Sequence, residues 1–308
     1  MAVPPAPTRR RALTVTLATA AAVIAAPAGV AAASPAAASP VAASPATVGR
    51  PSRPRPLRHA HAHNDYLHPR PLHDALAHGF TSVEADIFLV DGELLVAHDP
   101  AGLDPSRTLA GLYLEPLRAL VRAGHGSVHP HHRRPLQLLI DIKADGVAAY
   151  RELDRQFTRY GSLFTRYHHG RVRPGAVTAV ISGDRAARAP MEAQRTRLAF
   201  YDGRLDDLGT ASPASFTPLI SANWTQTFGW LGAGPFPRAE RDRLRTLVRA
   251  AHREGRRIRF WATPDLPGPE REAVWSELLA AGVDHLNTDD LAGLERFLRA
   301  RTGVAPTP

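Results

Sequence analysis

The sequence contains no cysteine, which excludes a disulfide framework and thiolate chemistry. It contains one lysine, Lys143, among 38 basic residues, so arginine supplies almost all of the positive charge. Acidic residues are absent before Asp65. Because this chain almost never uses lysine for general positive charge, the rarity of lysine favours a functional role for Lys143.

The formal net charge of +9 would suit a nucleic acid or an anionic membrane surface as a partner. Residues 1–58 hold seven arginines and no acidic residue, which leaves 38 − 7 = 31 basic against 29 acidic residues, a net charge of +2 for the remainder. Nucleic-acid binding needs a basic face on the folded domain itself, so we expect no nucleic-acid partner.

The N-terminus reads as an export signal. Three consecutive arginines, Arg9 to Arg11, precede an apolar run over 12–26 that is short for a membrane span, and small residues follow it. We interpret 1–33 as a signal peptide of the twin-arginine type, with an ordinary secretory leader as the alternative. Either signal predicts an exported protein, extracellular or in the cell envelope. Residues 34–57 are rich in Ala, Ser and Pro and predict a disordered linker; 304–308 predict a disordered tail.

The stretch from His59 to Asp99 gathers three polar clusters into about forty residues. The pattern predicts a helix over Pro71–His78 and a strand over Thr81–Leu89. Alternation along that strand places Glu84 and Asp86 on one face, opposite Val83, Ala85 and Ile87. An Asp-Gly turn then folds the chain back and returns His98 towards the two acids. Because buried carboxylates must be paired or bind a metal, this unit is the predicted centre of the site.

Strand and helix patterns alternate through the remaining chain, eight times in about 245 residues. This count and length predict one (β/α)8 TIM barrel over 58–303, an α/β fold, with a doubly wound open sheet as the alternative. The weakest helix is the one expected after Tyr201, because Gly203–Ser212 has little periodicity. The other predicted elements are helices over Leu109–Ala123, Val147–Phe157, Ala186–Gln194, Arg238–His252, Pro269–Ala281 and Leu291–Arg301, and strands over Leu136–Lys143, Ala176–Ser182, Leu198–Tyr201, Pro218–Asn223, Arg257–Thr263 and Val283–Asn287.

Chemistry in such a barrel lies at the carboxyl ends of the strands, where the polar residues of this chain fall. The side chains of Asn64, Glu84, Asp86 and Asp141 form an all-oxygen set, which selects one divalent cation, Ca²⁺ or Mg²⁺, rather than zinc. Two nearby histidines, His63 and His98, can divide general acid and general base duty at a phosphate, in an order that the sequence leaves open.

Three further residues have less certain places in this scheme. Lys143 could hold a phosphate, or it could form a structural ion pair with Asp141. Trp261 is open between a wall for the substrate and packing at the barrel mouth. His61 lies two residues before His63 and is expected to support a ligand rather than to be one.

The motifs HAHNDY, SVEADIFLVDG, LLVAHD and LLIDIK together resemble the phospholipase C-like phosphodiesterases, the barrel superfamily of glycerophosphodiester phosphodiesterases and phosphatidylinositol-specific phospholipases C. The branch of altered inheritance of mitochondria protein 6 is the most similar. The resemblance implies a phosphoric diester hydrolase with His63 and His98 in acid–base catalysis, a metal held by Glu84, Asp86 and Asp141, and Asn64 at a position that also touches the metal.

The resemblance also implies a lipid headgroup or glycerophosphodiester-like substrate and a possible cyclic phosphate product. The His-Arg-Gly motif of glycerophosphodiesterases is absent, since Asn64 and Asp65 follow His63. Peripheral contact with a membrane is compatible with such a substrate, and a monomer is expected.

Two other functions fit parts of the sequence. A metal-dependent amidohydrolase also opens with His-Ala-His and uses a strand lysine, but it needs histidines at the ends of two middle strands, and the predicted strands there have none. A non-catalytic barrel that binds a headgroup would be marked by loss of an acid or histidine from the set, and all are present.

Overall fold

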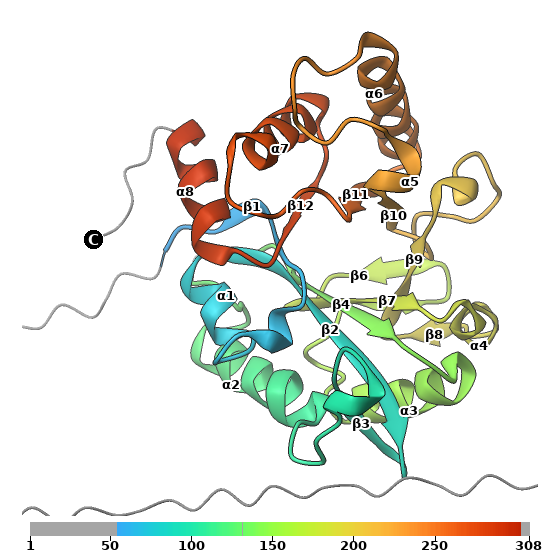
Figure 1. Ribbon diagram of the computed structural model, residues 1–308. Coiled ribbons are helices and arrows are strands. Elements are labelled where there is room, and N and C mark those ends of the chain that lie inside the picture. The colour runs from blue at the N-terminus through green and yellow to red at the C-terminus, as the bar shows by residue number, and fades with distance from the viewer. Residues whose placement is uncertain (1–53, 131, 303–308) are drawn as a thin grey trace, which may run out of the picture. The chain divides into compact units, whose positions relative to one another are not determined.

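The computed structural model describes residues 54–130 and 132–302, so the predicted signal peptide, most of the linker and the tail lie outside the described residues. Eight parallel strands form the closed barrel predicted from the sequence (Figure 1). The strands are β1 (Leu57–Ala62), β2 (Phe80–Val90), β4 (Leu136–Ile142), β7 (Val177–Gly183), β9 (Ala199–Gly203), β10 (Leu219–Asn223), β11 (Arg257–Trp261) and β12 (His285–Thr288). Pairing of β1 with both β2 and β12 closes the sheet, which excludes the open-sheet alternative.

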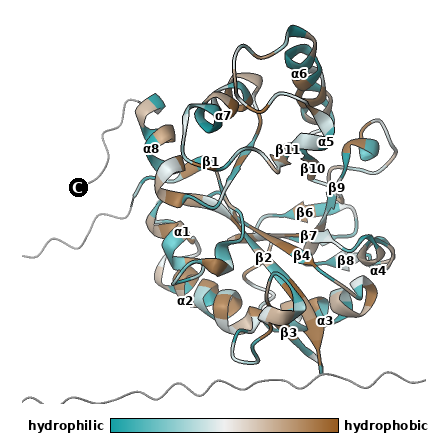
Figure 2. Cartoon of the chain, in the orientation of Figure 1, coloured by the Kyte–Doolittle hydropathy of each residue, from teal (hydrophilic) through white to brown (hydrophobic). Residues whose placement is uncertain are grey.

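Helices surround the barrel on its outer side, largely where amphipathic patterns predict them (Figure 1). Figure 2 shows apolar residues along the central strands β2 and β4 and mixed polar and apolar faces on the surrounding helices. The helices are α1 (His73–Ala77), α2 (Glu115–Ala123), α3 (Gly146–Arg159), α4 (Arg188–Glu192), α5 (Trp224–Thr227), α6 (Arg238–Arg253), α7 (Pro269–Ala281) and α8 (Leu291–Thr302). No helix within the described ranges is long and apolar enough to cross a membrane.

The predicted hairpin after β2 is confirmed. Val90 pairs with Glu93 across the turn, and β3 (Glu93–Val96) runs antiparallel to β2. Asp91 and Gly92 both have positive φ, 49° and 84°, as a tight two-residue hairpin turn requires. This antiparallel arm returns the chain to the barrel mouth and delivers His98 there.

The chain differs from the prediction in several places. The expected helix over Leu109–Ala123 begins with a π-helical turn, Ala110–Leu114, before α2. Only a short 3-10 helix, Leu205–Asp207, lies between β9 and β10, where the sequence lacks helical periodicity. A second sheet that the sequence pattern did not reveal consists of β5 (Arg166–His168), β6 (Arg171–Arg173) and β8 (Thr196–Arg197).

The barrel interior contains an apolar cluster and a polar network. Leu139, Val180, Phe200 and Leu219, from β4, β7, β9 and β10, pack together as the apolar cluster. Strand register places Glu84 on β2 beside Leu139, which in turn lies beside Val180, so the acid borders this cluster. The polar network consists of buried side chains from the other interior positions: His61, Ser82, Glu84, Ser182, Asp202, Ser221, Arg259 and Asn287.

Candidate active site

Three predicted carboxylates meet at the mouth of the barrel. Asp86 on β2 lies in register with Asp141 on β4, and strand alternation turns Glu84 to the same interior face. One oxygen from each of Glu84, Asp86 and Asp141 lies within 4.8 Å of the others. A cluster of hard oxygen donors with Glu84 and Asp86 buried fits a divalent cation such as Mg²⁺ or Ca²⁺.

Asp86 has two oxygens in unequal surroundings. Its Oδ2 accepts a hydrogen bond from the Tyr66 hydroxyl at 2.6 Å and contacts Lys143 Nζ at 2.7 Å and His98 Nδ1 at 3.2 Å. Its Oδ1 is buried and has no hydrogen-bond partner within the described part of the chain. A buried carboxylate oxygen without a donor is costly unless a cation or water meets it, so Oδ1 fits a ligand atom.

Lys143 lies between two of the acids rather than beside Asp141 alone. Its Nζ is 3.4 Å from Asp141 Oδ1, in addition to its closer contact with Asp86. Burial opposes the charged lysine, but Asp141 and Asp86 outweigh that effect and raise the pKa of Lys143. Burial, with the charges of Glu84 and Asp86 opposing Lys143, raises the pKa of Asp141 to about 6. This geometry is compatible with a structural ion pair and with phosphate binding, because a lysine at the barrel mouth can contact both the acids and a phosphate.

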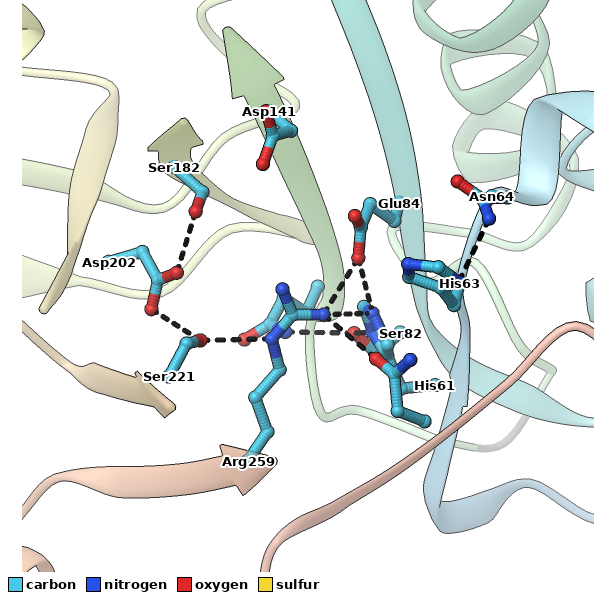
Figure 3. A network of polar contacts seen from close by, with 12 residues as sticks. His61, His63, Asn64, Ser82, Glu84, Asp141, Ser182, Asp202, Ser221 and Arg259 are labelled. Atoms are coloured by element: carbon cyan, nitrogen blue, oxygen red, sulfur yellow. Dashed lines mark hydrogen bonds and ion pairs between the residues drawn. The ribbon is translucent and has the colours of Figure 1, made fainter. Parts of the chain in front are cut away.

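Glu84 is anchored from inside the barrel (Figure 3). Its Oε2 accepts a hydrogen bond from Arg259 Nη1 at 2.7 Å, and His61 Nε2 lies 2.9 Å away. Burial alone would favour the neutral acid, but the Arg259 charge and the contact with His61 hold the pKa of Glu84 well below its usual value. Burial lowers the pKa of His61 to about 4, so this ring is neutral at pH 7. The structure places His61 behind Glu84, and its role in supporting that acid stays a prediction.

Arg259 is a site residue that the sequence prediction missed. Its Nε donates to Ser221 Oγ at 2.9 Å and its Nη1 contacts Asn287 Oδ1 at 3.1 Å. Ser221 in turn donates to the buried Asp202, which also accepts from Ser182 Oγ at 2.8 Å (Figure 3). The available signal was the alternation in Arg-Ile-Arg-Phe-Trp, which turns Arg257, Arg259 and Trp261 to one face of a buried strand.

His63 sits at the end of β1 and is oriented by an acid from the far end of the chain. Its Nδ1 lies 2.7 Å from Asp289 Oδ1, and Asp289 directly follows β12. Burial favours the neutral ring, but the hydrogen bond to Asp289 and the negative charge of Glu84 raise the pKa of His63. The sequence prediction missed Asp289, because its partner lies 226 residues away.

Asn64 adopts a left-handed backbone conformation, φ 47°, directly after β1. Its Nδ2 lies 2.9 Å from His63 Nδ1, and its Oδ1 accepts from the Tyr66 hydroxyl at 2.9 Å. Tyr66 therefore connects Asn64 to Asp86. This arrangement places the amide beside His63, and its role as a metal ligand stays a prediction.

His98 points to the acidic cluster, as the hairpin predicted, with its Nδ1 3.2 Å from Asp86 Oδ2. Its side chain remains 62% exposed and lines a cavity of about 500 Å³ together with Tyr66 and Arg107. Trp261 ends β11 at the same rim and is partly exposed, so its contact with a substrate remains a prediction.

Gly183 ends β7 beside Ile142 and lies close to Asp141. Its φ is +79°, and a Cβ at this position would lie 2.2 Å from the backbone oxygen of Ile142 and 2.6 Å from Asp141 Oδ1. Only glycine fits both the left-handed backbone and this close approach. The orientation of Asp141 thus depends on a residue without a side chain.

Two family profiles match the chain. The AIM6-like phosphodiesterase domain matches residues 55–202, and the glycerophosphoryl diester phosphodiesterase family matches residues 257–292. An altered inheritance of mitochondria protein 6 homolog from Arthroderma benhamiae is 30% identical over 255 residues, which cover 75% of this chain and 81% of the relative. Altered inheritance of mitochondria protein 6 from Eremothecium gossypii is 29% identical over 278 residues, which cover 78% and 69%.

Among solved structures, a glycerophosphoryl diester phosphodiesterase from Parabacteroides distasonis aligns with a TM-score of 0.46 and 14% identity, covering 83% of this chain and 90% of that one.

Proposed function

Because the chain belongs to the AIM6-like phosphodiesterase family, we propose that it is a metal-dependent phosphoric diester hydrolase with His63 and His98 as its acid–base pair. The observation that carries this proposal is the meeting of three carboxylates with both histidines at one barrel mouth. Glu84, Asp86 and Asp141 would hold the cation, with Asn64 as a further candidate ligand.

The charges of the site suit a phosphodiester. Three carboxylates with Arg259 and Lys143 sum to −3 + 2 = −1, and a divalent cation changes this to +1. A phosphodiester carries one negative charge, so the loaded site and the substrate would be complementary. A bound Mg²⁺ or Ca²⁺ would neutralise non-bridging phosphate oxygens and lower the pKa of a coordinated hydroxyl.

The geometry favours His63 as the general base. With Nδ1 held by Asp289, its Nε2 is left to accept a proton from an attacking hydroxyl, in the manner of a histidine–carboxylate pair. His98, exposed beside Asp86, would protonate the leaving oxygen. Lys143 and Trp261 would contact the phosphate and the rest of the substrate.

We further propose that the substrate is a lipid headgroup or a glycerophosphodiester-like molecule. Attack by a neighbouring substrate hydroxyl would give a cyclic phosphate, and attack by water a linear product. Peripheral contact with a membrane, a monomeric state and export by the twin-arginine route are proposals that rest on the sequence pattern.

The test is a panel of phosphodiesters assayed with Mg²⁺, Ca²⁺ or a chelator, with cyclic and linear products resolved. His63→Ala and His98→Ala should each lower turnover by ~10²–10⁴-fold, because each removes half of the acid–base pair. His168→Ala, which alters an exposed histidine on β5, serves as the control and should leave turnover unchanged. Full activity in either rim variant, with the fold intact, would refute the assignment.

A further inference from the structure

Both buried carboxylates of the acidic cluster present one occupied oxygen and one open oxygen. Glu84 Oε2 faces Arg259 and His61, whereas no donor among residues 54–130 and 132–302 contacts Oε1. Asp86 repeats the pattern, with three donors near Oδ2 and a partnerless Oδ1. In each acid the protein already engages one carboxylate oxygen, which leaves the other oxygen to bind a cation.

Arg259 is the part of this arrangement that is fixed most firmly. Its guanidinium is held by Ser221 from β10 and by Asn287 from β12 while it contacts Glu84 on β2. Ser221 is itself bonded to Asp202 at 2.7 Å. A planar fork with several fixed donors can serve all these partners at once, which a lysine ammonium cannot do in the same geometry. Glu84 therefore cannot rotate its Oε2 towards the mouth without breaking a buried ion pair.

We propose that Arg259 is a positioning residue that confines Glu84 to coordination through a single oxygen and thereby biases the site towards Mg²⁺ over Ca²⁺. Ca²⁺ takes six to eight oxygen ligands and often binds a carboxylate through both oxygens. Mg²⁺ is smaller, demands near-ideal octahedral geometry and keeps several of its waters, so it takes fewer oxygens from the protein. A glutamate with one oxygen held inside the barrel can offer a cation only its other oxygen, which suits Mg²⁺ and removes the two-oxygen mode that Ca²⁺ often uses. The inference rests on the metal dependence proposed above.

The experiment is calorimetric titration of the chelator-treated protein with Mg²⁺ and, separately, with Ca²⁺. The native protein should bind Mg²⁺ more tightly than Ca²⁺. Arg259→Lys keeps the charge but loses the fork, so the ratio of the two affinities should shift towards Ca²⁺ by at least about tenfold. Arg299→Lys is the matched control, because it alters a buried arginine paired with Glu295 on the outer helix α8, and it should keep the native ratio.

Circular dichroism establishes that each variant is folded before titration. If Arg259→Lys does not fold, Ser221→Ala takes its place, because it loosens Arg259 without removing it; the ratio should then move in the same direction by a smaller factor. An unchanged ratio in the folded variant, or native binding that favours Ca²⁺, overturns the role of Arg259. Native protein that binds neither cation instead refutes the proposed metal dependence, and the inference falls with it.

Discussion

The apolar cluster and the polar network fill the barrel interior with opposite chemistry. Leu139, Val180, Phe200 and Leu219 pack against one another by dispersion and burial. The polar network places charged groups in the same interior, where Arg259 pairs with Glu84. Replacing a buried ion pair by well-packed apolar residues is often neutral or stabilising. The polar network is therefore better explained by the acid that it orients than by any gain in stability.

The largest expected effect on stability comes from a substitution in the apolar cluster. Phe200→Ala should lower the free energy of unfolding by about 3–5 kcal/mol, because it removes a large buried ring and leaves a cavity. Chemical denaturation measures this loss, and titration with Mg²⁺ should show an affinity close to the native value. A large loss of metal affinity in the folded variant would show that the apolar cluster and the acidic site are not independent.

Part of the pH dependence of stability should come from the polar network. His61 has a pKa of about 4 when folded and an ordinary value of 6.5 when unfolded, so the unfolded chain binds more protons between these limits. His61 therefore contributes stability that is fully present above pH 6.5 and is lost as the pH falls towards 4, at most about 3 kcal/mol. His61→Gln should flatten this part of the stability curve, measured by denaturation from pH 4 to 7, whereas Phe200→Ala should retain the slope.

The smallest expected effect concerns the link behind Arg259. In the native protein Ser182 and Arg204 both donate hydrogen bonds to Asp202. Asp202→Asn turns an amide donor towards these two donors and should lower the free energy of unfolding by about 1–2 kcal/mol. Asp242→Asn, on the exposed face of α6, is the control and should change stability by less than about 0.5 kcal/mol. An equal loss of unfolding free energy in the two variants would show that the buried hydrogen bonds of Asp202 stabilise the protein no more than an exposed acid does.

Local pattern was sufficient to predict much of the fold. Most barrel strands follow from short segments that are apolar or alternate, and the hairpin that carries His98 follows from the Asp-Gly turn. The three carboxylates could be grouped because parallel strands end at the same rim, so residues far apart in the chain share one location.

What the sequence could not reveal depends on contacts without a local pattern. Arg259 is one of many arginines, and its partner Glu84 lies 175 residues earlier, so the alternation that turns Arg259 into the barrel does not reveal which acid it meets. Asp289 acts on His63 across a similar separation. The strands β5, β6 and β8 are only two or three residues long, too short to show alternation, and β8 joins β5 from a later part of the chain.

Gly183 gives the site an unusual kind of fragility. Substituting any other amino acid there would push a backbone carbonyl and an acid apart while every group with reactive chemistry stayed in place. A relative could thus retain all histidines and carboxylates and still lose the geometry through one added methyl group. A search for inactive relatives would miss this loss of activity if it inspected only the reactive side chains and not the glycine at this position.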